Sequence, residues 1–302
     1  MNKKWECYDI DEKLLYDFMQ KYKLNEILAR VLISKNITKK DDMDLFMNPT
    51  RKDFHDPFLM PDMNIIVDRI LKAIDNEEKI MIYGDYDADG ITSITVLKTF
   101  LEERGLKVES YIPNRLDEGY GLNKEAIKKI YDSGYRLIIT VDCGISGIDE
   151  VDYANSLGME VLITDHHEPG QNLPNALAIV DAKRKDNQYP FNQLAGVGVV
   201  FKLIQAISIS LNLDEKEYLK YLDIVCIGTI SDIVPLSDEN RVIAKLGLKL
   251  VNQTKNIGLK ALLEILGFKQ IDSGIISFGV APRINACGRM GNEKVALDLF
   301  LS

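Results

Sequence analysis

The chain has 302 residues, of which 46% are hydrophobic and 27% are charged. This is the ordinary composition of a globular protein, and it excludes disordered, fibrous and collagen-like chains. The chain carries 37 Lys and Arg against 46 Asp and Glu, a net charge of -9, which argues against a protein that holds nucleic acid by bulk positive charge alone.

The sequence contains no run of about 18 or more apolar residues, and its N-terminus lacks the apolar core of a signal peptide. The four cysteines lie far apart and form no CxxC pair: Cys7, Cys143, Cys226 and Cys287. This spacing argues against a disulfide framework or a zinc knuckle and favours a reducing compartment. We therefore expect a cytoplasmic protein that does not enter a membrane.

Residues 1–75 are predicted to form a helical leader that packs on the rest of the chain. Apolar residues recur at roughly helical spacing over 14–27 and again over 65–74. Between these two stretches, Asn48-Pro49-Thr50 and Asp56-Pro57 break the pattern.

From residue 79 onward, short apolar runs alternate with helical patterns. The runs predict strands over 79–83, 107–112, 136–141, 160–164 and 176–180. The patterns between them predict helices over 91–103, 124–131 and 148–157. Apolar strands separated by helices are typical of a parallel sheet covered by helices on both faces. We expect an α/β domain over 76–240 and a helical segment over 241–302.

Acidic and histidine side chains follow the ends of the predicted strands. The stretches are Asp85-Tyr86-Asp87-Ala88-Asp89-Gly90, Asp142-Cys143-Gly144, Asp165-His166-His167-Glu168 and, further on, Gly228-Thr229-Ile230-Ser231-Asp232. In open parallel sheets, ligands bind beyond the carboxyl ends of the strands. So many carboxylates in one pocket repel one another unless they point apart or cations hold them. Carboxylates with one or two imidazoles suit Mn²⁺ or Mg²⁺ better than metals that prefer soft ligands.

Each of these stretches has a simpler explanation when it is taken alone. Asp-x-Asp-x-Asp-Gly could open a calcium loop, but the twelfth position of that loop is Val96 instead of Glu. A single acid after a strand is more often a turn former or a helix cap. Gly196-Val197-Gly198 could form a phosphate loop, but a dinucleotide fingerprint needs Gly where this chain has Phe201. We expect close helix packing at these glycines.

Taken together, the four acidic stretches resemble the four motifs of the DHH phosphoesterase superfamily in their order and their placement at strand ends. Tyr111-Ile112-Pro113-Asn114-Arg115, Gly119-Tyr120-Gly121 and residues 282–290 are similar to the RecJ family of single-strand-specific DNA exonucleases within it. The resemblance covers roughly residues 50–302. It implies a metal-dependent 5′→3′ exonuclease that hydrolyses phosphodiester bonds of single-stranded DNA and releases mononucleotides, in DNA repair and recombination.

The resemblance also implies two divalent cations, Mn²⁺ or Mg²⁺, in the α/β domain, which would be the catalytic one. The residues expected to bind them are Asp85, Asp87, Asp89, Asp142, His166 and Asp232. Asp142 would bridge the two cations, with the other acids of the first motif on one side and His166 and Asp232 on the other. His167 would contact the scissile phosphate or the leaving oxygen, and Asp165 would orient a histidine. The catalytic residues would thus be Asp142, His167 and Asp165.

A second set of residues is expected to contact the DNA strand. Its members are Asn114, Arg115, His167, Arg283, Asn285 and Arg289, and Tyr120 could stack on a base. Many superfamily members carry a His four residues before the first Asp of the Asp-x-Asp pair. This chain has Tyr83 there, so one cation would depend more on carboxylates.

The family also has a second, DHHA1-type domain and often an OB-fold, and neither is visible by residue 302. The sequence ends in an apparent amphipathic helix, which predicts further protein beyond it. The expected partners are single-stranded DNA, a single-strand-binding protein and a RecQ-type helicase. Two alternatives stay open: a DHH phosphodiesterase acting on short oligonucleotides or cyclic dinucleotides, and a non-catalytic DHH scaffold. The scaffold predicts missing ligands, whereas the four motifs here keep their acids and histidines.

Overall fold

The computed structural model describes residues 9–115 and 117–302. The chain divides into two compact units, one ending at Asp53 and the other running from Phe54 to Ser302. The first unit is helical, with α1 (Glu12–Tyr22), α2 (Glu26–Ser34), α3 (Lys40–Met47) and the 3₁₀ helix η1 (Arg51–Asp53). Its small core includes Phe18 of α1 and Leu32 of α2.

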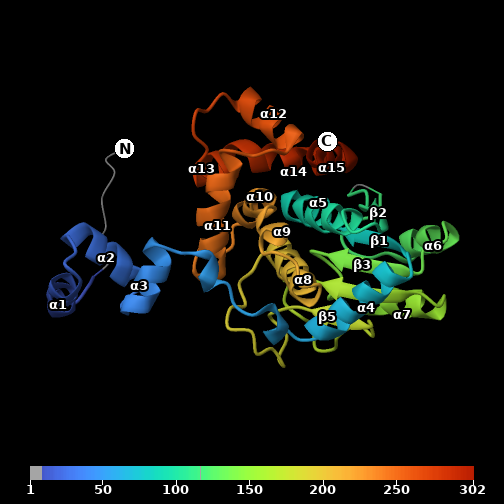
Figure 1. Cartoon of the computed structure of the whole chain (residues 1–302), viewed down its shortest axis with the longest axis horizontal. Helices are drawn as coiled ribbons and strands as arrows, with labels where there is room; N and C mark the ends of the chain where they lie inside the picture. Colours follow the sequence, from blue (N-terminus) through green and yellow to red (C-terminus); the bar gives the residue numbers. More distant parts are fainter. Residues whose placement is uncertain (1–8, 116) are drawn as a thin grey trace. The chain divides into compact units, whose positions relative to one another are not determined.

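A five-stranded parallel sheet forms the centre of the second unit (Figure 1). Its strands are β1 (Lys79–Gly84), β2 (Lys107–Tyr111), β3 (Leu137–Val141), β4 (Glu160–Thr164) and β5 (Ala178–Val180). Their order is β2-β1-β3-β4-β5, so the chain reverses its direction across the sheet between β1 and β3. Ligands bind at such switch points in open α/β sheets. The expected parallel α/β fold is confirmed.

Helices cover both faces of the sheet. One face packs against α4 (Met63–Asp75), α5 (Ala88–Glu102) and α8 (Gly196–Ser210), and the other against α6 (Lys124–Asp132) and α7 (Ile148–Ser156). Strand alternation explains the two cores: Ile80 and Ile82 face the first set of helices, whereas Met81 and Tyr83 face the second.

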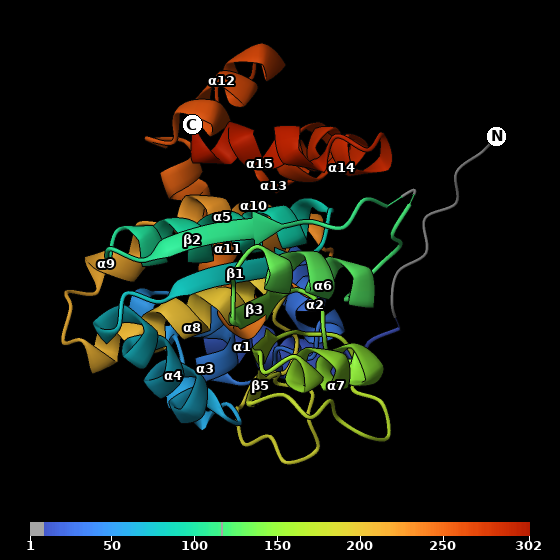
Figure 2. The same ribbon diagram turned by 90° about the vertical axis from the view of Figure 1, so that its right-hand side faces the viewer.

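The remaining helices extend the layer that contains α5. They are η2 (Pro57–Leu59), α9 (Lys216–Leu219), α10 (Leu222–Ser231), α11 (Asp238–Val251), α12 (Ile257–Leu266), α13 (Ser273–Ile275), a π-helix η3 (Ile276–Val280), α14 (Ala281–Arg289) and α15 (Glu293–Leu301). Helices α14 and α15 contact α5 and lie at the far end of the molecule from β5 (Figure 2). In the described part of the chain, none of the helices has both the length and the apolar character that a membrane span needs.

The boundaries differ from the prediction at three places. The second unit begins at Phe54, so α4, which we placed in the leader, belongs to it, as do the helices after residue 241. The last strand is shorter, at Ala178–Val180. Helix α5 begins at Ala88 because Oδ1 of Asp87 accepts hydrogen bonds from the backbone N of Asp89 and Gly90, at 2.9 and 3.0 Å. Asp89 therefore lies in the helix, whereas Asp85 and Asp87 precede it.

Candidate metal centre

Three strand ends bring the acidic motifs to one edge of the sheet. Gly84 is paired with Val141, and Val141 with Thr164, so β1, β3 and β4 end side by side. Asp142 follows β3 with a φ of 58°, a left-handed conformation that Asp tolerates better than most residues. Its backbone N donates to Thr164 O at 3.0 Å, which fixes this turn against β4.

Glycines let two helices approach these acids closely. A Cβ atom on Gly196 would lie 2.5 Å from Oδ1 of Asp142, so only glycine fits at the start of α8. The backbone N of Gly196 and of Val197 donate to the two oxygens of Asp89, at 2.6 and 2.9 Å. The first turn of α8 is thus capped by Asp89, and the close packing expected at these glycines is confirmed.

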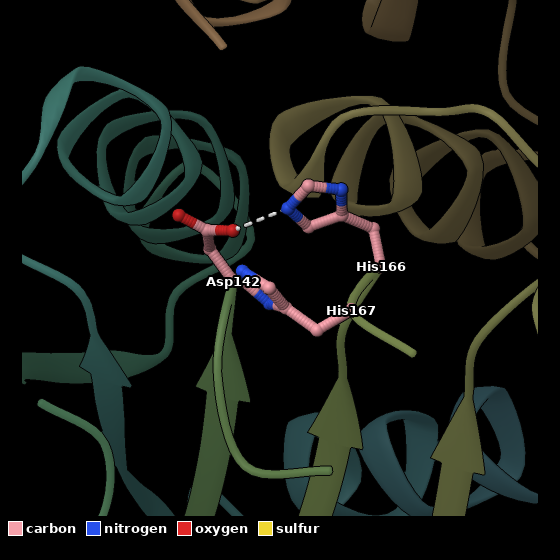
Figure 3. A group of neighbouring side chains, drawn as sticks. All are labelled: Asp142, His166 and His167. Atoms are coloured by element: carbon pink, nitrogen blue, oxygen red, sulfur yellow. Dashed lines mark ion pairs between the residues drawn. The ribbon is translucent and has the colours of Figure 1, made fainter. Parts of the chain in front are cut away.

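Three overlapping groups of side chains could each hold a metal ion. They are Asp142 with His166 and His167, Asp89 with His166 and Asp232, and Asp85 with Asp87 and Asp142. Within each group, one ligand atom from every residue lies within 4.8 Å of the others. Asp142 and His166 each belong to two groups, and they face each other with Oδ1 and Nε2 3.1 Å apart (Figure 3).

The grouping agrees with the expected sharing of Asp142 and differs for one acid. We expected Asp89 beside Asp85 and Asp87, whereas the structure groups it with His166 and Asp232. The reason is that Asp89 is in the first turn of α5, and α5 packs against α10, whose end carries Asp232.

The carboxylates of this cluster are buried without enough positive charge around them. Burial, and next the charge of Asp87, raise the pKa of Asp85 to about 7. Burial and the charge of Asp89 raise the pKa of Asp232 to about 7. Burial and the neighbouring Asp89 and Asp87 raise the pKa of Asp142 well above its usual value. Burial lowers the pKa of His166, so this imidazole favours its neutral, metal-binding form.

The residues present fit a divalent cation. Asp142 Oδ1 is buried and receives no hydrogen bond within the described part of the chain. A buried carboxylate oxygen without a donor is costly unless a cation compensates it. The donor set is carboxylate oxygen with imidazole nitrogen and no thiolate, which suits Mn²⁺ or Mg²⁺.

Asp165 holds His167 beside the cluster. Asp165 Oδ1 lies 2.7 Å from His167 Nδ1, and its Oδ2 accepts from the backbone N of Ile145 at 2.9 Å. Burial alone would raise the pKa of Asp165, but the hydrogen bond with His167 and the backbone donors outweigh it and lower the pKa. The same bond raises the pKa of His167. The geometry is that of a carboxylate orienting an imidazole.

The segment between β2 and α6 brings two of the expected substrate residues near the cluster. The Tyr120 hydroxyl lies 3.3 Å from Asp142 O and 3.3 Å from His167 Nδ1. The guanidinium of Arg115 lies 5.3 Å from the centre of the Tyr86 ring. Asn114 instead has its backbone N bound to Glu118 Oε2, at 2.8 Å.

Tyr83 is turned away from the cluster. It is fully buried, stacks on Tyr111, and donates from its hydroxyl to Gly121 O at 2.9 Å. It therefore contributes no ligand, as its position in the alternation of β1 dictates.

Two acids near the site had escaped sequence reasoning. Glu118 accepts from the Tyr111 hydroxyl at 2.5 Å, and Asp181 follows β5 fully buried, with burial raising its pKa to about 7. Asp181 repeats the pattern of an acid directly after a strand and could have been found by it. Nothing local in the sequence marks Glu118.

The residues expected from α14 are divided. Asn285 reaches the cluster, where its Oδ1 accepts from the backbone N of Ala88 at 2.8 Å. Arg283 does not: its Nη1 donates to Gly279 O at 2.7 Å, and it lines a separate hollow with Phe268 and Phe278. Arg289 is exposed in the last turn of α14, one turn beyond Asn285 and on the same side of the helix.

The chain is similar in sequence to bacterial exonucleases. The single-stranded-DNA-specific exonuclease RecJ of Bacillus subtilis is 42% identical over 301 residues, covering 99% of this chain and 38% of the relative. The protein of the same name from Thermus thermophilus is 36% identical over 233 residues, covering 76% of this chain and 34% of the relative. The chain thus spans less than half the length of these relatives.

Solved structures agree with the sequence comparison. RecJ from Thermus thermophilus in complex with Mn²⁺ superposes with a TM-score of 0.81 at 29% identity, covering 97% of this chain and 41% of that chain. An exonuclease RecJ bound to manganese gives a TM-score of 0.74 at 34% identity, covering 80% of this chain and 61% of that chain.

The family assignment rests on a match over half of the sequence. Residues 79–229 match the DHH family, N-terminal domain, and this range runs from β1 into α10. The resemblance expected from the four motifs is confirmed. The chain belongs to the DHH family.

Proposed function

We propose that this chain is a metal-dependent 5′→3′ exonuclease that hydrolyses single-stranded DNA to mononucleotides, in DNA repair and recombination. The observation that carries the proposal is the overlap of three possible ligand groups through Asp142 and His166. Two-metal hydrolases of phosphodiesters need such shared ligands, because their cations lie only about 3.5–4 Å apart. The names of the similar proteins support the substrate.

We assign the cation ligands from the three groups. Asp142 would bridge, Asp85 and Asp87 would hold one cation, and the group of Asp89, His166 and Asp232 would hold the other. When bound, the cations lower the pKa of a coordinated water and stabilise negative charge on phosphate oxygens.

His167 and Asp165 act on the reacting phosphate. Asp165 occupies Nδ1 of His167, which leaves Nε2 as the nitrogen that faces substrate. The raised pKa of His167 favours a protonated ring, which donates to the scissile phosphate or the leaving oxygen. Asp165 keeps its charge because its own pKa is lowered, and it therefore stabilises the protonated histidine.

The strand itself is held by residues around the cluster. Arg115 and Arg289 match phosphate with a planar fork of donors. Tyr120 is half exposed beside His167 and offers a ring on which any base can stack. The net charge of -9 predicts weak binding of long DNA outside this site.

The cellular setting is also a proposal. A single-strand exonuclease needs an open strand, so a RecQ-type helicase and a single-strand-binding protein are the partners we propose. A cytoplasmic location is supported by the free thiols of Cys143, Cys226 and Cys287.

The test is digestion of a single-stranded oligonucleotide labelled at its 5′ or its 3′ end, with Mn²⁺ or with EDTA. We expect Mn²⁺-dependent release of labelled mononucleotide from the 5′ end first. Cleavage of dinucleotides but not of the long strand would favour the phosphodiesterase of short substrates. A chain that binds DNA without cleaving any of these would favour the scaffold.

A further inference from the structure

Helix α14 contacts the acidic segment 85–89 through a side chain that carries no charge. Asn285 Oδ1 accepts a hydrogen bond from the backbone N of Ala88, at 2.8 Å and across 197 positions of sequence. Ala88 is the first residue of α5, so its N–H has no partner inside the helix. The next two N–H groups are bound by Asp87 Oδ1. Asn285 therefore completes the N-terminal cap of α5.

Gly288 makes a second contact with the same segment. A Cβ atom on Gly288 would lie 2.4 Å from the backbone O of Tyr86. A backbone oxygen cannot swing aside as the tip of a long side chain can, so only glycine permits this approach. The contact is independent of the first, because it depends on backbone packing and not on a hydrogen bond.

The helix that supplies both contacts is itself held firmly. Its other face buries Ala281 and Ile284, and Ile284 belongs to the main core of the second unit. Asn285 also lines a hollow of about 80 Å³ together with Asp87, Asp89 and Asp232. The segment 85–89 therefore leans on a fixed support at the point where its carboxylates gather.

We propose that Asn285 and Gly288 are positioning residues of the metal site, which hold segment 85–89 so that Asp85 and Asp87 stay within reach of Asp142. The inference rests on the cation site of the proposed function. It gives Asn285 a part different from the substrate contact that the resemblance implies. Loss of hydrogen bonds that support metal ligands commonly lowers metal affinity about 10- to 100-fold.

The test is calorimetric titration of the whole chain with Mn²⁺, in the absence of nucleic acid. Asn285→Ala should weaken Mn²⁺ binding about 10-fold, and Gly288→Ala at least as much. Gly279→Ala is a matched control, since a Cβ there would lie 3.5 Å from Leu266, an ordinary contact. Asn292→Ala is a second control, since Asn292 is exposed and its side chain caps nothing. Both controls should bind Mn²⁺ like the wild type.

Asn285→Asp separates positioning from substrate contact. The carboxylate keeps an acceptor for the Ala88 N–H, as Asp and Asn cap helices about equally well, but it loses the amide donor. We expect Mn²⁺ affinity within about 3-fold of the wild type for this variant. Wild-type Mn²⁺ affinity in Asn285→Ala, with a raised KM for single-stranded DNA in both variants, would overturn the proposal in favour of substrate contact.

Hydrogen exchange in the metal-free chain tests the positioning without any metal. The Ala88 amide should exchange roughly 10-fold faster in Asn285→Ala, while the amides of β3 stay unchanged. Equal Ala88 rates in the two chains would refute the inference. A wild-type chain that binds no Mn²⁺ would refute the proposed metal site, and the exchange rates would still decide the positioning.

Discussion

The second unit contains two buried groups of charged side chains that are built in opposite ways. In one, Lys202 and Glu239 are fully buried as an ion pair of 2.8 Å. Lys202 Nζ also donates to His55 O at 2.7 Å, and Glu239 accepts from the Tyr189 hydroxyl and from the backbone N of His55. No polar atom of Lys202 or Glu239 is buried without a hydrogen bond.

The other group is the acidic cluster at the sheet edge. It has several buried carboxylates with raised pKa values, and Asp142 Oδ1 receives no hydrogen bond within the described residues. The first group is neutralised by its own members and stabilises the fold, whereas the second requires charge from outside. The comparison teaches that the balance of charge and donors, and not burial alone, distinguishes a structural cluster from a binding site.

The largest effect should come from Asp142→Asn, which removes the shared charge of the cluster. Asn tolerates the φ of 58°, so the backbone should keep its conformation. We expect the hydrolysis of single-stranded DNA to fall roughly 1,000-fold or more, equivalent to about 4 kcal/mol. In EDTA the Tm should equal or exceed that of the wild type, because one repelling charge is gone. Retained Mn²⁺-dependent cleavage of an end-labelled oligonucleotide would contradict the assignment.

Lys202→Met should do the reverse, harming stability and sparing the metal site. Removing one partner of a buried ion pair costs about 3–5 kcal/mol, because the other charge stays buried alone. Urea denaturation should measure this loss, and the double variant with Glu239→Gln should recover part of it. Lys128→Ala is the control, since the Lys128–Asp132 pair is about half exposed and should leave the Tm unchanged. Weaker Mn²⁺ binding in the folded Lys202→Met chain would contradict the separation of the two groups.

Stability and pH should be linked differently with and without metal. The folded pKa of Asp85 and of Asp232 is about 7, above the unfolded value of about 3.9, so the metal-free chain loses stability as pH rises from about 4 to 7. Mn²⁺ binds the deprotonated form, so it should compensate this loss over the same range. The Tm gained on adding Mn²⁺, relative to EDTA, should be at least about 5 °C larger at pH 8 than at pH 5.5. A gain independent of pH would show that these carboxylates do not bind the metal.

The smallest effect is expected at the rim of the cluster. Tyr120→Phe removes a hydroxyl whose two contacts, with Asp142 O and His167 Nδ1, are long at 3.3 Å. The KM for single-stranded DNA should rise about 3-fold with kcat nearly unchanged, because the stacking ring remains. Tyr16→Phe, an exposed tyrosine of the first unit, is the control. A large fall in kcat would instead give the Tyr120 hydroxyl a part in the reaction.

The strands and their acidic ends could be predicted because those signals are local. The run over 160–164 was found with its bounds, and Asp142 and Asp165 were placed after their strands from the apolar runs before them. The start of α5 was missed by three residues, since Asp87 caps a helix in which Asp89 already lies. A capping signal three residues upstream could have corrected it.

What only the tertiary structure decided is which distant residues share the cluster. Asp89 groups with Asp232 because α5 packs on α10, and Asn285 meets Ala88 because Gly288 lets α14 approach the backbone of Tyr86. Arg283, only two residues before Asn285, faces another hollow. The sequence by itself determined the parallel sheet and the acids at its edge, since alternation and strand ends depend on neighbours along the chain. Contacts between helices depend on packing across nearly 200 positions, which no local pattern records.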